Sequence, residues 1–319
     1  MLHDVFFQMV NECVRLTVLA LVMLPIRKIL KRVSARMCYY FWSILPMSTL
    51  IRVFFFMFRD RDTIPGGLQT GSSLFVLPRE LFYLLEAIWL LGMVVKLYGI
   101  VIPYIKLKRY LVGSIWKEEN VFVSSRVTTP FSMGLFAPKI YLPAGLEEAY
   151  YVPVVLHEKV HIARKDLWVK AIAVFLTVLF WFCPIWNKLC DLCVEDMEAA
   201  CDEAVVRKSP ETFKQQYAEA LIVVSSFGGD AQKLSLGCGR EAIEERIDHI
   251  LRYGKASKGN KRKTLFMCMV FGILLVSATP LLPNVFGRAL AAETESGKTG
   301  DGEQSRDVNC RTIFLSKTE

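Results

Sequence analysis

The stretch Leu156-His157-Glu158-Lys159-Val160-His161 decides how the rest of the chain is interpreted. It has the form H-E-x-x-H and lies in a window with helical character. Two histidines four residues apart lie on one face of a helix, so both imidazoles can bind one metal ion. Glu158 adjoins the first histidine and can act as general base toward a water held at that ion. Because two neutral imidazoles with an open position suit Zn²⁺, we predict a catalytic zinc site at residues 157–161.

A catalytic zinc site needs a third protein ligand, and residues 194–203 offer several carboxylates. Glu198 and Asp202 form E-x-x-x-D, which puts both side chains on one helical face together with Glu195. We predict Glu198 as the third zinc ligand and Asp202 as the acceptor for the free N–H of a ligating histidine. The alternative is an acidic helix start, because carboxylates favour a helix N-terminus. The upstream H-E-x-x-H favours the ligand interpretation, against a surface helix with incidental histidines.

The composition indicates membrane segments around this motif. Apolar residues make up 53% of the 319 residues, and the mean hydropathy is +0.34. The apolar residues cluster in runs that are long enough to cross about 30 Å of hydrocarbon as helices. These runs cover residues 5–26, 38–58, 81–105 and 265–285. We therefore expect a mainly α membrane protein with four transmembrane helices.

The distribution of charge predicts the orientation of these helices. The loops 27–36, 106–109 and 252–263 are basic, whereas the charges of 59–80 balance. Since cytoplasmic loops carry the excess of Lys and Arg, we place both termini outside and the segment between the third and fourth spans in the cytoplasm. The net charge of +8 is then mostly a consequence of topology, and direct nucleic-acid binding is not expected.

These boundaries divide the chain into four parts. Residues 1–106 are expected to hold three transmembrane helices with short loops, and 107–263 a water-facing α+β domain inserted between the third and fourth spans. The fourth helix covers 264–285, and 286–319 form a short extracellular disordered tail. Within the domain, 167–189 is apolar enough to span, but His161 and Glu198 must meet at one zinc. That run is therefore expected to be re-entrant or membrane-associated, or else a buried pair of core helices.

Several motifs in a fixed order resemble the BlaR/MecR-type antirepressor peptidases, which are membrane-embedded gluzincins. The zinc motif extends through residues 157–166 as H-E-K-V-H-I-A-R-K-D, and 198–203 read E-A-A-C-D-E against the family's E-x-x-C-D-E. Residues 181–186, W-F-C-P-I-W, resemble W-F-N-P-x-x-W, and 129–143 resemble S-P-x-x-x-G-x-x-x-P-x-I-x-L-P. The resemblance covers about residues 1–285. It implies that His157, His161 and Glu198 bind Zn²⁺ and that Glu158 is the catalytic carboxylate.

The resemblance also implies a function. It predicts a zinc metalloendopeptidase in the bacterial cytoplasmic membrane that cleaves itself, a DNA-binding repressor, or both. A non-proteolytic docking transducer and a housekeeping protease for membrane proteins are the alternatives. The family ends in an extracellular penicillin-binding sensor domain, whereas 286–319 lack a Ser-x-x-Lys motif. Covalent sensing of β-lactams by this chain alone is therefore not expected, and the stimulus, a separate sensor protein and a homodimer are left open.

The remaining motifs carry weaker predictions. The nine cysteines are an odd number partly inside apolar runs, which indicates reduced thiols rather than a disulfide framework. Cys190-Asp191-Leu192-Cys193 is more often packing than a redox or metal site at helical spacing. His249 is either a transition-state donor or an ordinary surface histidine. Residues 121–123 and 139–142 are strand-like, and in gluzincins an edge strand beside the zinc helix holds an extended substrate.

Overall fold

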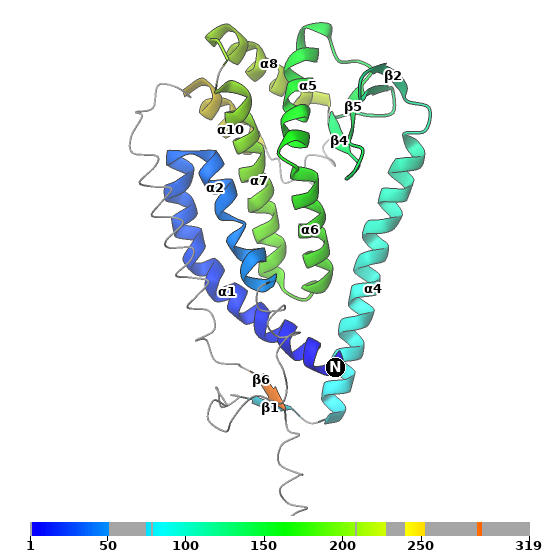
Figure 1. Cartoon of the computed structure of the whole chain (residues 1–319), viewed down its shortest axis with the longest axis vertical. Coiled ribbons are helices and arrows are strands. Elements are labelled where there is room, and N and C mark those ends of the chain that lie inside the picture. The colour runs from blue at the N-terminus through cyan, green and yellow to red at the C-terminus, as the bar shows by residue number, and fades with distance from the viewer. Residues whose placement is uncertain are drawn as a thin grey trace, which may run out of the picture.

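Helices dominate the described part of the chain. The computed structural model describes residues 2–50, 75–77, 79–207, 209–227, 240–252 and 286–288. Its helices are α1 (Leu2–Val33), α2 (Ala35–Phe41), α4 (Arg79–Tyr110), α5 (Glu148–Ala163), α6 (Asp166–Leu179), α7 (Pro184–Val206), α8 (Glu211–Phe227) and α10 (Arg240–Arg252). Residues 44–50 are helical as well. The sheet gathers at one end with α5, α8 and α10, whereas α1, α2, α4, α6 and α7 extend away from it (Figure 1).

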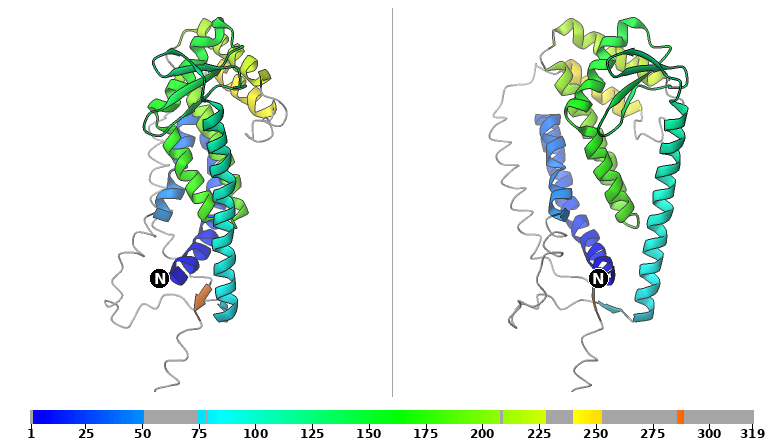
Figure 2. Two further views of the ribbon diagram at one scale, coloured as in Figure 1. Left: turned by 90° about the vertical axis from the view of Figure 1, so that its right-hand side faces the viewer. Right: turned by 45° about the vertical axis from the view of Figure 1, so that its right-hand side comes forward.

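Helix α4 has the length and composition of a membrane span. Its segment Tyr83–Tyr110 has a mean hydropathy of 1.9, and only 11% of its most apolar window is buried. It stands at one side of the helical group with most of its apolar side chains exposed (Figure 2). Within the described residues it is the one helix that meets both criteria for crossing a membrane. The chain is thus mostly helical with one candidate membrane helix.

Helix α1 is equally long but faces the inside of the helical group. Asn11 and Glu12 are buried, and Arg15 donates to Glu12 over 2.7 Å one turn away. The first predicted span lies within α1. The second is described only as far as residue 50, and the fourth, 264–285, lies outside the described residues. The four-span topology therefore stays a prediction.

A four-stranded sheet packs with α5 and α8 at one end of the molecule (Figure 1). Its strands are β2 (Ile115–Glu118), β3 (Val121–Ser124), β4 (Phe131–Met133) and β5 (Lys139–Pro143), in the order β2-β3-β5-β4. β3 and β5 run parallel, and the outer strands pair antiparallel to them. Val121, Ile140 and Leu142 of β3 and β5 pack against Val154 and Val155 of α5 and Ala220 of α8. This apolar contact holds α5 on the sheet.

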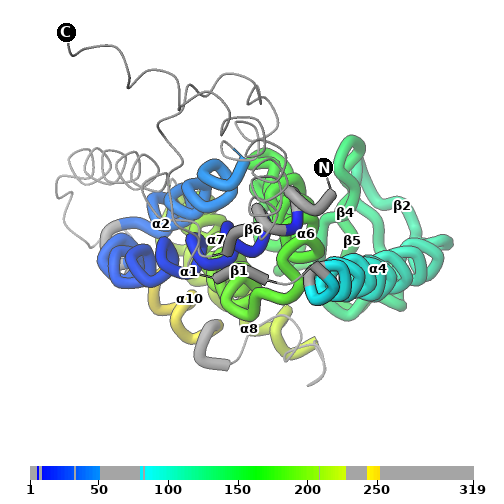
Figure 3. The backbone as a smooth tube through the Cα atoms, turned by 90° about the horizontal axis from the view of Figure 1, so that it is seen from below, coloured from blue at the N-terminus to red at the C-terminus, as the bar shows by residue number. Residues whose placement is uncertain are grey.

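The predicted apolar run 167–189 forms a helical hairpin. Helix α6 leads away from the sheet, residues 180–183 turn, and α7 returns (Figure 1). The tip docks on α4: Trp89 Nε1 donates to the Leu179 carbonyl over 3.1 Å, and Trp181 Nε1 donates to the Trp89 carbonyl over 3.0 Å. Viewed along the long axis, α6 and α7 lie between α4 and the pair α1 and α2 (Figure 3). One apolar core joins all five helices.

A small two-stranded sheet lies at the opposite end from the four-stranded sheet (Figure 1). Strand β1 (Phe75–Leu77) pairs in parallel with β6 (Phe286–Arg288). These three residues of β6 are the described part of the predicted tail. Residues 289–319 lie outside the described chain.

Candidate metal centre

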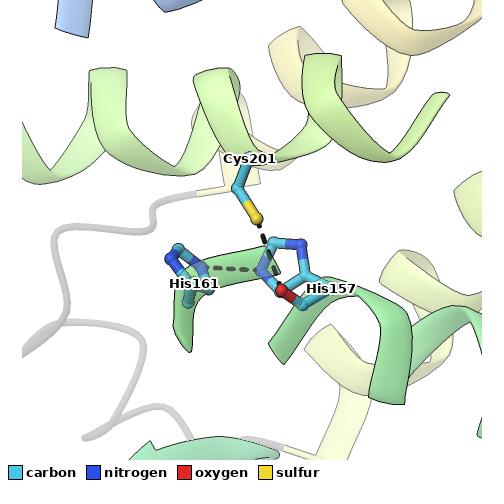
Figure 4. A group of neighbouring side chains, drawn as sticks. All are labelled: His157, His161 and Cys201. Atoms are coloured by element: carbon cyan, nitrogen blue, oxygen red, sulfur yellow. Dashed lines mark hydrogen bonds between the residues drawn. The ribbon is translucent and has the colours of Figure 1, made fainter. Parts of the chain in front are cut away.

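The two histidines of α5 meet at their outer ring nitrogens. Because they are four residues apart on one helix, His157 and His161 lie on the same face. Their Nε2 atoms are 3.1 Å apart, and both side chains are buried. Figure 4 shows both rings directed toward the space between α5 and α7. Glu158 is also buried on the same turn of α5.

Each histidine is held by a hydrogen bond at its inner nitrogen, Nδ1. His161 Nδ1 lies 2.7 Å from Asp166 Oδ2. This contact depends on the short turn between α5 and α6, where Lys165 adopts a left-handed conformation with φ of 60°. The turn brings Asp166, only five residues further on, back beneath the His161 ring.

The partner of His157 comes from α8. His157 Nδ1 lies 2.7 Å from the Tyr217 hydroxyl, which in turn donates to Asp202 Oδ1 over 2.7 Å. Burial and the Asp202 carboxylate raise the pKa of Tyr217 well above its ordinary value, so the hydroxyl stays protonated. Since that proton goes to Asp202, the hydroxyl oxygen accepts from His157 Nδ1. The network therefore assigns the proton of both imidazoles to Nδ1.

When both rings are neutral, this tautomer leaves the two Nε2 lone pairs, 3.1 Å apart, available to one cation. Two Zn–N bonds of 2.0–2.1 Å at a near-tetrahedral angle separate the nitrogens by about 3.3 Å. The spacing of the pair therefore fits that of two zinc ligands.

Helix α7 supplies a carboxylate and a thiol to the same space. Glu198 Oε2 lies 3.3 Å from His157 Nε2 and 3.5 Å from His161 Nε2. Cys201 is fully buried, and one ligand atom from each of His157, His161 and Cys201 lies within 4.8 Å of the others. The donor set of imidazole, carboxylate and thiol is one that Zn²⁺ accepts.

Asp202 is joined to α10 by a strong ion pair. Arg246 donates to both of its carboxylate oxygens, over 2.7 and 2.9 Å. Burial alone would raise the pKa of Asp202, but the Arg246 charge and these hydrogen bonds outweigh it and hold the pKa below its ordinary value. Asp202 Oδ1 is 3.5 Å from His157 Nδ1. The Tyr217 hydroxyl bridges them through two shorter contacts of 2.7 Å each.

Other acidic side chains of α7 anchor it to α1 and α2. Arg27 binds Asp196 through two hydrogen bonds of 2.6 and 2.9 Å, and Lys31 binds Glu195 over 2.7 Å. Glu203 accepts from the Ser34 hydroxyl and, over 3.2 Å, from the backbone N–H of Arg36. Glu203 thus caps the start of α2 from another helix.

The structure brings most of the predicted site residues into one cluster. His157, His161, Glu198 and Asp202 lie in it, and Glu158 is buried beside the first histidine. His249 is half-buried on α10. Cys190 and Cys193 are free thiols packed against the core of the helical group.

The sequence interpretation missed four residues of the cluster. Asp166 lay inside the extended zinc motif, and its distance of five residues from His161 was the available signal. Cys201 stood between the two predicted carboxylates. Tyr217 and Arg246 had no local signal, because they reach the site only through the packing of α8 and α10.

A known protein family resembles this chain over the region that holds the cluster. The family model described as BlaR1 peptidase M56 matches residues 68–250. The methicillin resistance mecR1 protein of Staphylococcus aureus is 26% identical over 175 residues, which are 52% of this chain and 30% of that protein. The regulatory protein BlaR1 of Bacillus licheniformis is 25% identical over 178 residues, or 54% of this chain and 29% of that protein.

The matched region thus spans less than a third of these relatives, whereas the family model covers more than half of this chain. The resemblance read from the motifs is confirmed at this level. The chain belongs to the BlaR1 peptidase M56 family.

Proposed function

We propose that this chain is a membrane-embedded zinc endopeptidase that cuts protein on the cytoplasmic side of the membrane. The observation that carries the proposal is the histidine pair. Both Nδ1 atoms are engaged, both Nε2 lone pairs converge, and Glu198 completes the group at 3.3 and 3.5 Å. We assign His157, His161 and Glu198 as the zinc ligands and Glu158 as the general base.

The residues of the site have separate roles in the proposed peptide hydrolysis. When bound, Zn²⁺ supplies a Lewis acid that favours attack of water on a carbonyl at neutral pH. Glu158 takes the proton of the attacking water and returns it to the leaving amine. Asp166 holds the His161 ring, whereas Tyr217 and Asp202 hold the His157 ring. Arg246 keeps Asp202 ionised and in place.

The charges near the helix ends support a cytoplasmic site. Arg27, Lys28 and Lys31 of α1 and Lys106 to Arg109 of α4 lie at the end of the helices that carries the sheet and the metal cluster (Figure 1). Basic residues next to membrane spans favour the cytoplasmic side. A cysteine introduced at the exposed Lys117 should therefore resist a membrane-impermeant thiol reagent in intact cells and react after permeabilisation. Labelling without permeabilisation would refute this orientation.

We further propose that the hairpin of α6 and α7 is re-entrant. Its tip contacts Trp89, which lies near one end of the apolar segment Tyr83–Tyr110. At 1.5 Å per residue, Trp89 is about 30 Å along the helix from Tyr110, nearly the thickness of the hydrocarbon core. A hairpin docked there enters the membrane from the side of the metal cluster and returns to it.

The role of the enzyme is proposed to be signalling. Two matched relatives are named for regulation or for methicillin resistance. By analogy, the substrates are this chain itself, a DNA-binding repressor, or both. A docking transducer without activity is disfavoured, because the complete ligand and base set is present at the cluster.

The test compares metal content with cleavage in the full chain, purified in nanodiscs. We expect about one zinc per wild-type chain, lost in His161→Ala and Glu198→Ala. Glu158→Gln should keep zinc and stop self-cleavage and repressor cleavage, because it removes only the base. Glu147→Gln, an exposed change at the residue just before the same helix, is the matched control. Wild-type protein without zinc after metal-replete purification would overturn the proposal.

A further inference from the structure

Cys201 is the one member of the cluster that the proposed mechanism does not use. It is fully buried on α7, and its thiol donates a weak hydrogen bond to the His157 carbonyl over 3.4 Å. Figure 4 shows the sulfur projecting from α7 toward the histidine pair. Its Sγ and the imidazole nitrogens lie within 4.8 Å of one another. This thiol therefore reaches the space that the metal would occupy.

A buried cysteine is often only a small apolar side chain, so the other described cysteines are a useful comparison. Cys13, Cys183, Cys190 and Cys193 belong to or pack against the core of the helical group. Cys38 lies in the same core and points at Asp196. Among the described cysteines, Cys201 alone stands in a group of potential metal ligands.

Helix geometry places Cys201 next to the predicted carboxylate ligand. Glu198 and Cys201 are three residues apart on α7 and therefore share a face. A Zn–S bond of 2.3 Å beside a Zn–N bond of about 2.05 Å separates sulfur from nitrogen by roughly 3.6 Å. Closing the distance from at most 4.8 Å requires a shift of about 1.2 Å or less. A small adjustment of the Cys201 rotamer or of α7 provides that movement.

We propose that Cys201 is a fourth protein ligand that closes the zinc site in the resting protein. The inference rests on the proposed zinc peptidase function and adds a regulation of the same site. Four protein ligands make a closed tetrahedral shell, whereas a catalytic zinc keeps one position open for water. Hydrolysis then requires that the thiolate leave the zinc. The released sulfur takes up a proton, and water fills the vacated position.

The position of α7 decides whether the thiol reaches the metal. Its other face is fixed to α1 and α2 through Asp196 and Glu203, whereas the histidines belong to α5, which sits on the sheet. A displacement of α1 relative to the sheet is therefore expected to change the distance between Cys201 and the histidines. A movement of α1 that carries α7 away from α5 would therefore separate Cys201 from the zinc and open the site to water.

The experiment is zinc K-edge X-ray absorption on the full chain in nanodiscs, with zinc content measured on the same samples. Wild-type protein should show about one sulfur neighbour per zinc at about 2.3 Å. Cys201→Ser and Cys201→Ala should lose that sulfur and keep the zinc, because three ligands remain. Cys193→Ser, on the same helix, is the matched control and should keep both. Self-cleavage without stimulus should rise in the Cys201 variants.

The outcomes separate this inference from the proposed function. Wild-type protein that binds zinc without a sulfur neighbour refutes the thiolate ligand and leaves the peptidase intact. A sulfur signal that persists in both Cys201 variants refutes it as well, because another thiol is then the ligand. Absence of zinc from the wild type overturns the proposed function itself. Cobalt substitution gives a second readout, since a thiolate-to-cobalt charge-transfer band should disappear in Cys201→Ala.

Discussion

Replacing Gly92 of α4 by alanine should detach the tip of the α6–α7 hairpin. A Cβ atom at Gly92 would overlap the indole of Trp181, so the ring must move away. That ring donates from Nε1 to the Trp89 carbonyl over 3.0 Å, and its displacement breaks this hydrogen bond. The hairpin carries Cys183 and Trp186 into the common core of the helices, so the effect spreads beyond the contact.

The magnitude follows from these two losses. Overpacking a well-filled contact costs about 1–3 kcal/mol. The lost hydrogen bond adds about 0.5–1.5 kcal/mol, with the lower end more typical of helix contacts in membranes. The better helix propensity of alanine returns about 1 kcal/mol, so we expect Gly92→Ala to lower the free energy of unfolding by about 1–3 kcal/mol. This is a large change for a single methyl group.

The same helix offers a matched control. A Cβ at Gly99 meets nothing within 4 Å, so Gly99→Ala should leave stability unchanged or raise it slightly through the better helix propensity of alanine. The assay heats the full chain in detergent and measures the fraction that stays monodisperse in size-exclusion chromatography. Gly92→Ala should lose this fraction at a clearly lower temperature than Gly99→Ala.

A double-mutant cycle tests whether the clash with Trp181 causes the loss of stability in Gly92→Ala. In a Trp181→Ala background the steric conflict is gone, so Gly92→Ala should cost little further stability. Equal melting of Gly92→Ala and Gly99→Ala would refute the docking of the hairpin tip on α4. An undiminished cost in the Trp181→Ala background would show that the damage has a different origin.

Three further changes test the network around the metal cluster. Tyr217→Phe removes the hydroxyl that supports one histidine, so zinc affinity should fall about 10–100-fold in a chelator competition, and unchanged affinity would refute that role. Arg27→Gln leaves the Asp196 carboxylate buried without its cation and should cost about 3–5 kcal/mol in thermal unfolding, whereas the exposed control Lys28→Gln should cost little. Glu203→Ala removes the acceptor at the start of α2 and should cost about 1–3 kcal/mol, and a wild-type melting temperature would contradict this capping role.

The sequence predicts those pairs of residues in the metal cluster that lie on the same helix. The distance of four residues between His157 and His161, and between Glu198 and Asp202, is a property of one helix and needs no tertiary structure. The contact between α5 and α7 could be predicted only because the zinc site was expected to take ligands from both segments. The strand segments 121–123 and 139–142 were likewise recognisable from their apolar residues, whereas their parallel pairing was not.

The supporting residues were beyond such reasoning for a physical reason. Tyr217 lies sixty residues from the histidine that it contacts, and Arg246 lies forty-four residues from Asp202. Tyrosine and arginine are common on amphipathic helices, and nothing in the neighbouring sequence distinguishes these two. Only the packing of α8 and α10 on α5 and α7 selects them. Residues that orient ligands are set by tertiary structure, while the ligands themselves follow local periodicity.

Helix α7 explains why the short segment 195–203 is so rich in acidic residues. Glu198 and Asp202 face the histidines and α10, whereas Asp196 and Glu203 face α1 and α2. A buried carboxylate is stable only when a cation or several donors surround it. Every one of these four has such partners, so α7 is held to α1 and α2 on one face and to the histidines and α10 on the other. The helix that presents Glu198 to the histidine pair is therefore also the helix that joins α1 to the cluster, so a displacement of α1 is expected to reach the proposed metal ligands.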